Sequence, residues 1–107
     1  MPSKADPFAA LADPTRRSLL ETLRDQPDQS AGQLASRFPR VSRAAVSKHL
    51  GVLRRARLVR AHHRGRERHY ALQADRIALL QEWLKSFAPM MEESLARLKR
   101  QVEERPE

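Results

Sequence analysis

The chain has 107 residues, 40% of them hydrophobic and 32% charged, which predicts a single domain with a modest core. It contains no cysteine, which excludes disulfides, thiolate metal sites and a cysteine nucleophile. The sequence shows neither a signal-peptide pattern nor an apolar run long enough to span a membrane, so we expect a cytoplasmic protein.

The excess positive charge is confined to one third of the chain. The formal net charge is +8, yet residues 37–69 alone hold eleven basic residues and one acidic residue, Glu67. The segments before and after each have a net charge of −1. This confinement predicts a polyanionic partner, most simply a nucleic acid. A membrane surface would require a basic amphipathic helix with bulky aromatic residues, and the basic segment contains only Phe38.

The first predicted elements are a tail and two helices. We expect residues 1–7 to form a mobile polar tail and residues 8–11 to form one or two helical turns. Asp13 is placed to cap a second helix that begins with Pro14, because proline lacks the N–H that a first helical position leaves unused. Residues 25–29 end this helix.

Two short helices follow. Ser30 and Gln33 form a capping-box pattern, and Pro39 ends the helix that they begin. Ser42 caps the next helix, whose apolar stripe repeats at spacings of four and three residues. This stripe comprises Val46, Leu50 and Leu53. Two short helices joined by about four residues, the second rich in positive charge, predict a helix-turn-helix.

The remaining pattern predicts a hairpin and a long helical segment. Residues 58–63 and 68–72 alternate as strands around a turn centred on Gly65, which predicts a β-hairpin with a basic tip. From residue 75 onward apolar residues recur every three or four positions, and Pro89 predicts either a kink or two abutting helices. We therefore expect a DNA-binding part over residues 8–74, a C-terminal helical part of the same domain over residues 75–102, and fraying over residues 103–107.

Three stretches of this sequence resemble the arsenic-repressor (ArsR) family of bacterial regulators, over about residues 8–85. They are Leu11-Ala-Asp-Pro-Thr-Arg-Arg-Ser-Leu-Leu, Ala45-Val-Ser-Lys-His-Leu-Gly-Val-Leu-Arg, and Leu58-Val-Arg through Arg64-Gly65-Arg66 to Tyr70-Ala-Leu. The resemblance implies a mainly α, winged helix-turn-helix protein with a small β-hairpin, dimerising through its terminal helices. It also implies a transcriptional regulator, most simply a repressor, in a branch of the family without metal ligands.

Two positions depart from the family pattern. Many members have a glycine just before the first strand of the hairpin, where the helix ends in a left-handed conformation, and this chain has Arg57. We expect a strained or differently shaped helix end there. Many members also have glutamine near the start of the recognition helix, where this chain has Arg43. Arginine suits guanine and glutamine suits adenine, so we expect a different operator sequence.

The predicted DNA contacts lie on the hairpin and on the helix that Ser42 caps, the recognition helix, mainly at its start and along the outward strip opposite its apolar stripe. They are Ser42, Arg43, Ala44, Ser47, Lys48, His49, Arg55, Arg64, Arg66 and Arg68. His49 lies at the edge of the apolar stripe and has two interpretations. Its position alone favours helix packing, whereas the family resemblance implies a DNA contact.

The histidines raise the question of a metal site, because clustered histidines bind zinc. His62 and His63 are adjacent in a strand and point to opposite faces, and the last helix contains no histidine. We therefore expect neither a bound metal nor a cofactor, and nothing in the sequence points to a particular inducer. The chain has three glycines and no glycine-rich phosphate loop, so we expect no catalytic activity.

The C-terminal segment has more apolar surface than a small core requires, which predicts a homodimer. The predicted interface consists of Phe8, Leu11, Leu80, Trp83, Leu84, Phe87, Met91 and Leu95. Three alternatives stay open. They are a monomer with its last helix folded back, an architectural protein that coats DNA without sequence preference, and a protein–protein adaptor that does not bind DNA.

Overall fold

The computed structural model describes residues 6–104 of the chain and divides it into two compact units, with the boundary after Ile77. Most of the tail expected over residues 1–7 and the last three residues of the expected frayed end lie outside the described residues. Pro7, expected in the tail, is instead the first residue of the first helix. Glu103, expected to fray, is instead the last residue of the last helix.

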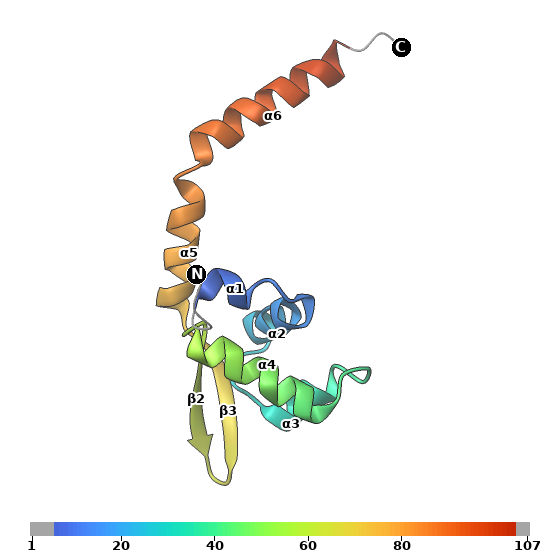
Figure 1. Cartoon of the computed structure of the whole chain (residues 1–107), viewed down its shortest axis with the longest axis vertical. Helices are drawn as coiled ribbons and strands as arrows, with labels where there is room; N and C mark the ends of the chain where they lie inside the picture. Colours follow the sequence, from blue (N-terminus) through green and yellow to red (C-terminus); the bar gives the residue numbers. More distant parts are fainter. Residues whose placement is uncertain (1–5, 105–107) are drawn as a thin grey trace. The chain divides into compact units, whose positions relative to one another are not determined.

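Four helices and a small sheet form the first unit (Figure 1). The helices are α1 (Pro7–Ala10), α2 (Pro14–Asp25), α3 (Ala31–Ser36) and α4 (Arg43–Arg55). The predicted caps are confirmed, since the side chains of Asp13, Ser30 and Ser42 each accept a backbone N–H three residues on. The Gln33 side chain also accepts the N–H of Ser30 at 2.8 Å, which completes the capping box.

The core of this unit consists of leucines and valines that are completely buried. They are Leu19, Leu23, Leu34, Val46, Leu50, Leu53, Leu58 and Val59. The predicted stripe of α4 is among them. Helix α4 contacts α2, α3 and the strand β2 (Val59–Arg64). Burial of this stripe orients α4, because the residues on its opposite side must then face solvent.

The sheet has three antiparallel strands, one more than the predicted hairpin. The strands are β1 (Gln29–Ser30), β2 (Val59–Arg64) and β3 (Glu67–Leu72), in the order β1-β3-β2. The hairpin prediction is confirmed, with Gly65 in its turn at φ +63°, where glycine is favoured. Strand β1 was not predicted, because it is only two residues long and Ser30 is also the cap of α3.

The end of α4 keeps the left-handed conformation without the usual glycine. Arg57 has φ +62°. The N–H of Leu58 donates to the carbonyl of Leu53 at 3.0 Å, and the N–H of Arg57 donates to that of Arg54 at 2.9 Å. These two bonds form a Schellman motif, and the side chains of Leu53 and Leu58 are completely buried. Of the two expected outcomes, the strained helix end is therefore the one observed.

The C-terminal segment consists of two helices, α5 (Ala74–Lys85) and α6 (Ala88–Glu103). The chain turns between them, and the N–H of Phe87 donates to the carbonyl of Leu84 at 3.1 Å. Pro89 lies in the first turn of α6, where its missing N–H costs no helical hydrogen bond. Of the two predicted arrangements, the abutting helices are confirmed. Among the described residues, no helix is long and apolar enough to cross a membrane.

Candidate nucleic-acid interface

The outward strip of α4 is exposed, as the sequence predicted. Its exposed members are Ser42, Arg43, Ala44, Ser47, Lys48 and Arg55. The opposite stripe of the helix is completely buried. One long face of α4, which carries polar, cationic and small side chains, is therefore accessible, as a helix that enters a DNA groove requires.

Two glycines accommodate arginines of this strip. A Cβ added to Gly32 of α3 would lie 3.2 Å from Nη2 of Arg43, so the guanidinium lies against the first turn of α3. A Cβ added to Gly51 would lie 3.4 Å from Nη1 of Arg55. Because Gly51 has no side chain, it leaves the backbone of α4 uncovered at the middle of the outer face, which permits close approach to DNA.

His49 is half-buried where α4 meets the start of α2. Its Nδ1 lies 3.5 Å from Nη1 of Arg16 and 3.9 Å from Oδ2 of Asp13. The Asp13 carboxylate accepts the backbone N–H of Arg16, which holds the pKa of Asp13 below its usual range. These contacts support the packing interpretation of His49.

Arg16 is a residue that the sequence analysis missed. Its Nε donates to the carbonyl of Ala10 at 2.7 Å, and its Nη2 donates to the carbonyl of Ala9 at 3.3 Å. Arg16 therefore joins α1 to α2 and reaches α4 through His49. No periodic signal identifies such a residue, because its partners are backbone carbonyls of another helix.

A hollow of about 300 Å³ flanks the outer face of α4. It is lined by Ala9, Ala10, Arg16, Lys48, Val52 and Arg55. Three cationic side chains and no acidic side chain line it, so an oxyanion such as a phosphate suits its rim.

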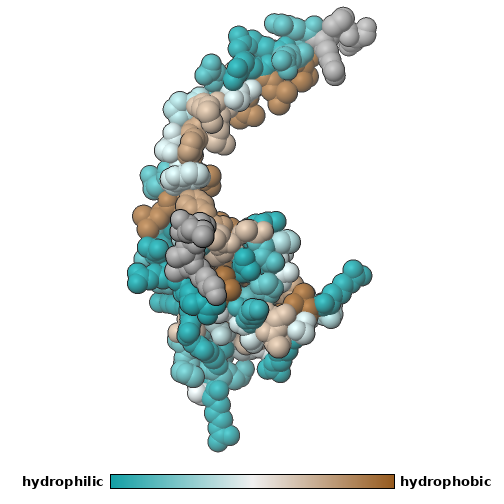
Figure 2. Space-filling model, in the orientation of Figure 1, coloured by the Kyte–Doolittle hydropathy of each residue, from teal (hydrophilic) through white to brown (hydrophobic). Residues whose placement is uncertain are grey.

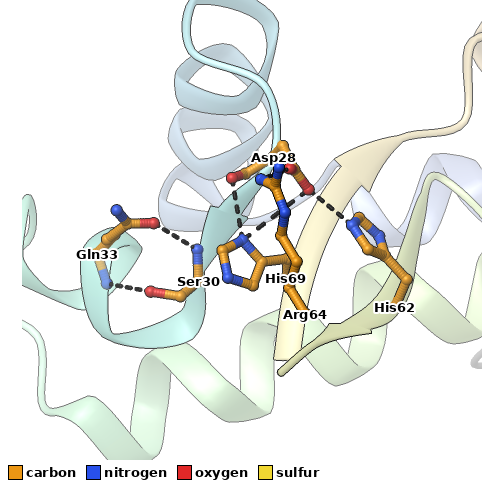
Figure 3. Close-up of polar contacts among 6 residues, drawn as sticks. All are labelled: Asp28, Ser30, Gln33, His62, Arg64 and His69. Atoms are coloured by element: carbon orange, nitrogen blue, oxygen red, sulfur yellow. Dashed lines mark hydrogen bonds and ion pairs between the residues drawn. The ribbon is translucent and has the colours of Figure 1, made fainter. Parts of the chain in front are cut away.

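The hairpin extends the basic surface beyond α4. Arg66 in the turn and Arg68 on β3 are exposed, and the Arg68 guanidinium lies 5.9 Å from the ring centre of Tyr70. Arg64 differs from them, because its Nη1 donates to Oδ2 of Asp28 at 2.5 Å (Figure 3). The three arginines that the sequence grouped together thus have different surroundings.

Asp28 is the second residue that the sequence analysis missed. It lies in the loop before β1, at φ +65°, and contacts His62 and His69 as well as Arg64. The sequence offered no signal for it, because the contacts join residues more than 30 positions apart. Within the described part of the chain, no group of three or more histidine, aspartate and glutamate side chains is arranged to hold a metal ion.

The predicted interface residues of the C-terminal segment differ in exposure. Leu80 is buried within the single chain and offers little surface to a second one. Trp83 and Phe87 pack edge to face, with ring centres 4.8 Å apart, and both stay partly exposed. Leu84, Met91 and Leu95 line an apolar groove of about 340 Å³. Near the start of the chain, Phe8 is exposed and Leu11 is half-buried.

Comparison with known proteins agrees with this arrangement. Residues 11–62 match the model of a helix-turn-helix domain. The chain is 32% identical to the transcriptional repressor SdpR of Bacillus subtilis, over 75% of this chain and 87% of that protein. It is 46% identical to the HTH-type transcriptional regulator Rv2034 of Mycobacterium tuberculosis, over 75% of this chain and 73% of that protein.

Solved structures show the same relationship. An ArsR-like transcriptional regulator from Rhodococcus sp. RHA1 superposes with a TM-score of 0.69 and 37% identity, covering 92% of this chain and 89% of that one. A possible transcriptional regulator for arsenical resistance superposes with a TM-score of 0.70 and 36% identity, covering 95% and 98%. The fold, the exposed basic face of α4 and these relatives together show that the chain belongs to the ArsR family of winged helix-turn-helix, DNA-binding transcriptional regulators.

Proposed function

We propose that this regulator is a repressor that binds a pseudo-palindromic operator as a homodimer and blocks transcription by occupying it. The observation that carries the proposal is the exposed outer face of α4, which lies within the one segment that holds the chain's excess positive charge. The similarity to a protein named as a transcriptional repressor supports the direction of regulation.

The reading of sequence is assigned to α4. Arg43 lies at the start of the helix, where recognition helices approach base edges, and arginine pairs with O6 and N7 of guanine. Ser47, one turn further, is short enough to contact either a base or a phosphate. Ala44 presents only a methyl group on the same face, which lets the helix lie deep in the major groove.

The hairpin is assigned to the phosphate backbone. Arg66 and Arg68 are exposed at and beside its tip, and contacts to phosphates position a protein without selecting sequence. Lys48 and Arg55, at the hollow beside α4, supply further phosphate contacts. The β2–β3 hairpin, which is the wing, and the flank of α4 thus raise the affinity for any duplex, and the start of α4 selects among duplexes.

The dimer is assigned mainly to α6, which has no buried residue in the single chain. Its apolar side chains form a seam along one side, visible in Figure 2 as a hydrophobic line beside hydrophilic surface. The seam comprises Met91, Leu95, Leu98 and Val102, each more than half exposed. Their spacings of four, three and four residues are those of a coiled-coil seam.

The charges beside this seam favour an antiparallel pair of α6 helices. In that orientation Leu95 of one copy meets Leu98 of the other, and Met91 meets Val102. The same register brings Glu92 close to Lys99 of the second copy, twice by symmetry. A parallel pair would instead set Lys99 beside the uncharged Ser94. The seam and its charges therefore support a second copy of this chain as the partner.

Sedimentation at micromolar concentration tests the dimer. The wild-type chain is expected to sediment at twice the chain mass, and Leu95→Glu is expected to shift it towards monomer. Glu92→Lys and Lys99→Glu should each weaken the dimer, because each sets like charges together, and the double variant should restore it. Unchanged dimerisation in Leu95→Glu would assign the interface to other surfaces.

Recovery of bound fragments from the genome of the source organism tests the function. The purified protein is expected to retain a few fragments that share an inverted repeat, with an affinity ratio to random duplex well above about 10³. Addition of protein should then reduce transcription from a promoter that overlaps such a repeat. A ratio near one would instead indicate a protein that coats DNA without sequence preference.

A further inference from the structure

Three side chains of the wing converge on Asp28 (Figure 3). Nε2 of His62 lies 2.7 Å from its Oδ1, and Nη1 of Arg64 donates to its Oδ2 at 2.5 Å. Nδ1 of His69 donates to its backbone carbonyl at 3.1 Å. One residue of the loop before β1 thus binds both strands of the hairpin.

The strand register explains why these side chains share one side of the sheet. His62 is the cross-strand partner of His69, and Arg64 is the partner of Glu67. Directly paired residues of antiparallel strands project from the same face, so Asp28 lies against the face that carries all four. Glu67 is consequently the other acidic group on the face that carries Arg64.

Asp28 also connects this face to the helix-turn-helix. Two residues further along the chain, Ser30 pairs with His69 in the sheet and caps α3. Ser30 is almost completely buried, and its capping box with Gln33 orders the start of α3. The contacts of Asp28 therefore set the position of the hairpin relative to α3 and the helix-turn-helix.

The pairing changes what Arg64 can do. A guanidinium that already donates to a carboxylate at 2.5 Å offers little net charge to a phosphate. A DNA phosphate would have to displace a carboxylate that is two-thirds covered and also held by His62. The Arg64 side chain is itself 66% exposed, and Arg66 at the tip of the same hairpin is exposed as well, so the carboxylate beside Arg64, not burial, distinguishes the two arginines.

We propose that Asp28 is a positioning residue for the wing, which fixes the hairpin against the helix-turn-helix and removes Arg64 from the cations that contact DNA. The proposal rests on the proposed function in one respect only, namely that the wing contacts phosphates. It separates Arg64 from Arg66, which composition and spacing treat alike.

Salt titration of binding to a random-sequence duplex tests the proposal with the full-length chain. The logarithm of the affinity falls linearly with the logarithm of the salt concentration, and each phosphate contact adds about 0.9 to the steepness of this fall. The magnitude of this fall is called the slope below. Arg66→Ala is expected to lower the slope by about one unit per wing, and Arg64→Ala is expected to leave it unchanged. Asp28→Asn should raise the slope by up to about one unit per wing, because it releases Arg64. Asparagine tolerates the left-handed backbone of residue 28, so this substitution leaves the loop unstrained.

Glu67→Gln is the matched control, because it removes an equal charge from the same face without releasing Arg64. The double variant Asp28→Asn with Arg64→Ala should lose the rise in slope that Asp28→Asn alone produces. Adding Arg64→Ala to Glu67→Gln should leave the slope unchanged. A purely structural role for Asp28 would not raise the slope. The proposal is overturned if Arg64→Ala alone lowers the slope as much as Arg66→Ala, or if Asp28→Asn fails to raise it. An unchanged slope in Arg66→Ala would instead contradict the wing–phosphate contact itself.

Discussion

Replacing Arg57 by glycine should stabilise the protein. Arg57 is exposed, and its backbone has φ +62°, a conformation that costs a residue with a Cβ about 1–2 kcal/mol. Glycine removes this cost but adds freedom to the unfolded chain, which offsets about 0.5–1 kcal/mol of the gain. The net expectation is a rise of about 0.5–1 kcal/mol in the free energy of unfolding. For a domain of this size, the melting temperature Tm should rise by about 2–8 °C.

Urea unfolding at one fixed protein concentration measures the effect, because dimerisation makes apparent stability depend on concentration. Arg57→Gly should raise the midpoint without changing the dependence on urea. Arg54→Gly is the matched control, since Arg54 is also exposed but lies within α4, where glycine should cost about 1 kcal/mol. If Arg57→Gly lowered the midpoint as Arg54→Gly does, the left-handed end of α4 would be refuted.

Three further outcomes are expected. Asp13→Ala should cost about 1 kcal/mol of stability at neutral pH through loss of the α2 cap. Because the folded-state pKa of Asp13 is lowered, this difference should be present above about pH 4 and shrink as the pH falls through the folded value, in acid-unfolding curves. Arg43→Ala should cost about 1–3 kcal/mol on the operator and much less on random duplex, with relaxed preference at one guanine per half-site in a binding competition. Operator affinity, titrated after chelation, should be indifferent to micromolar zinc, cadmium and arsenite. A tenfold loss would indicate a regulatory metal site among the histidines of residues 62–69.

Local signals predicted most of the helices and the hairpin. The caps at Asp13, Ser30 and Ser42 are formed by side chains that contact backbone three residues away, so the sequence alone contains both partners. The buried stripe of α4 follows from its spacing, and the exposed strip follows from the stripe. The surface that is proposed to recognise DNA could therefore be predicted from the periodicity of the sequence.

Contacts between distant segments were not accessible in the same way. Asp28 contacts Arg64 across 36 positions, and Arg16 approaches His49 across 33. A composition that is rich in arginine marks a basic hairpin but does not reveal which arginine is already paired. Strand β1 was missed for the same reason, because two residues carry no periodicity and their partners in β3 lie 41 and 39 positions away.

The left-handed residues of the described chain show how the wing is positioned. Asp28 precedes β1, Arg57 precedes β2, and Gly65 lies in the turn between β2 and β3. Each strand of the sheet therefore begins at or near a backbone conformation that favours glycine, yet only the turn contains one. The other two are held by specific partners, which are three side chains around Asp28 and a pair of helix-terminal hydrogen bonds at residue 57. A residue that stays in such a conformation requires surroundings that over-determine it. The angle between wing and recognition helix thus depends on these two joints, and substitutions there should alter DNA binding without touching any residue that contacts DNA.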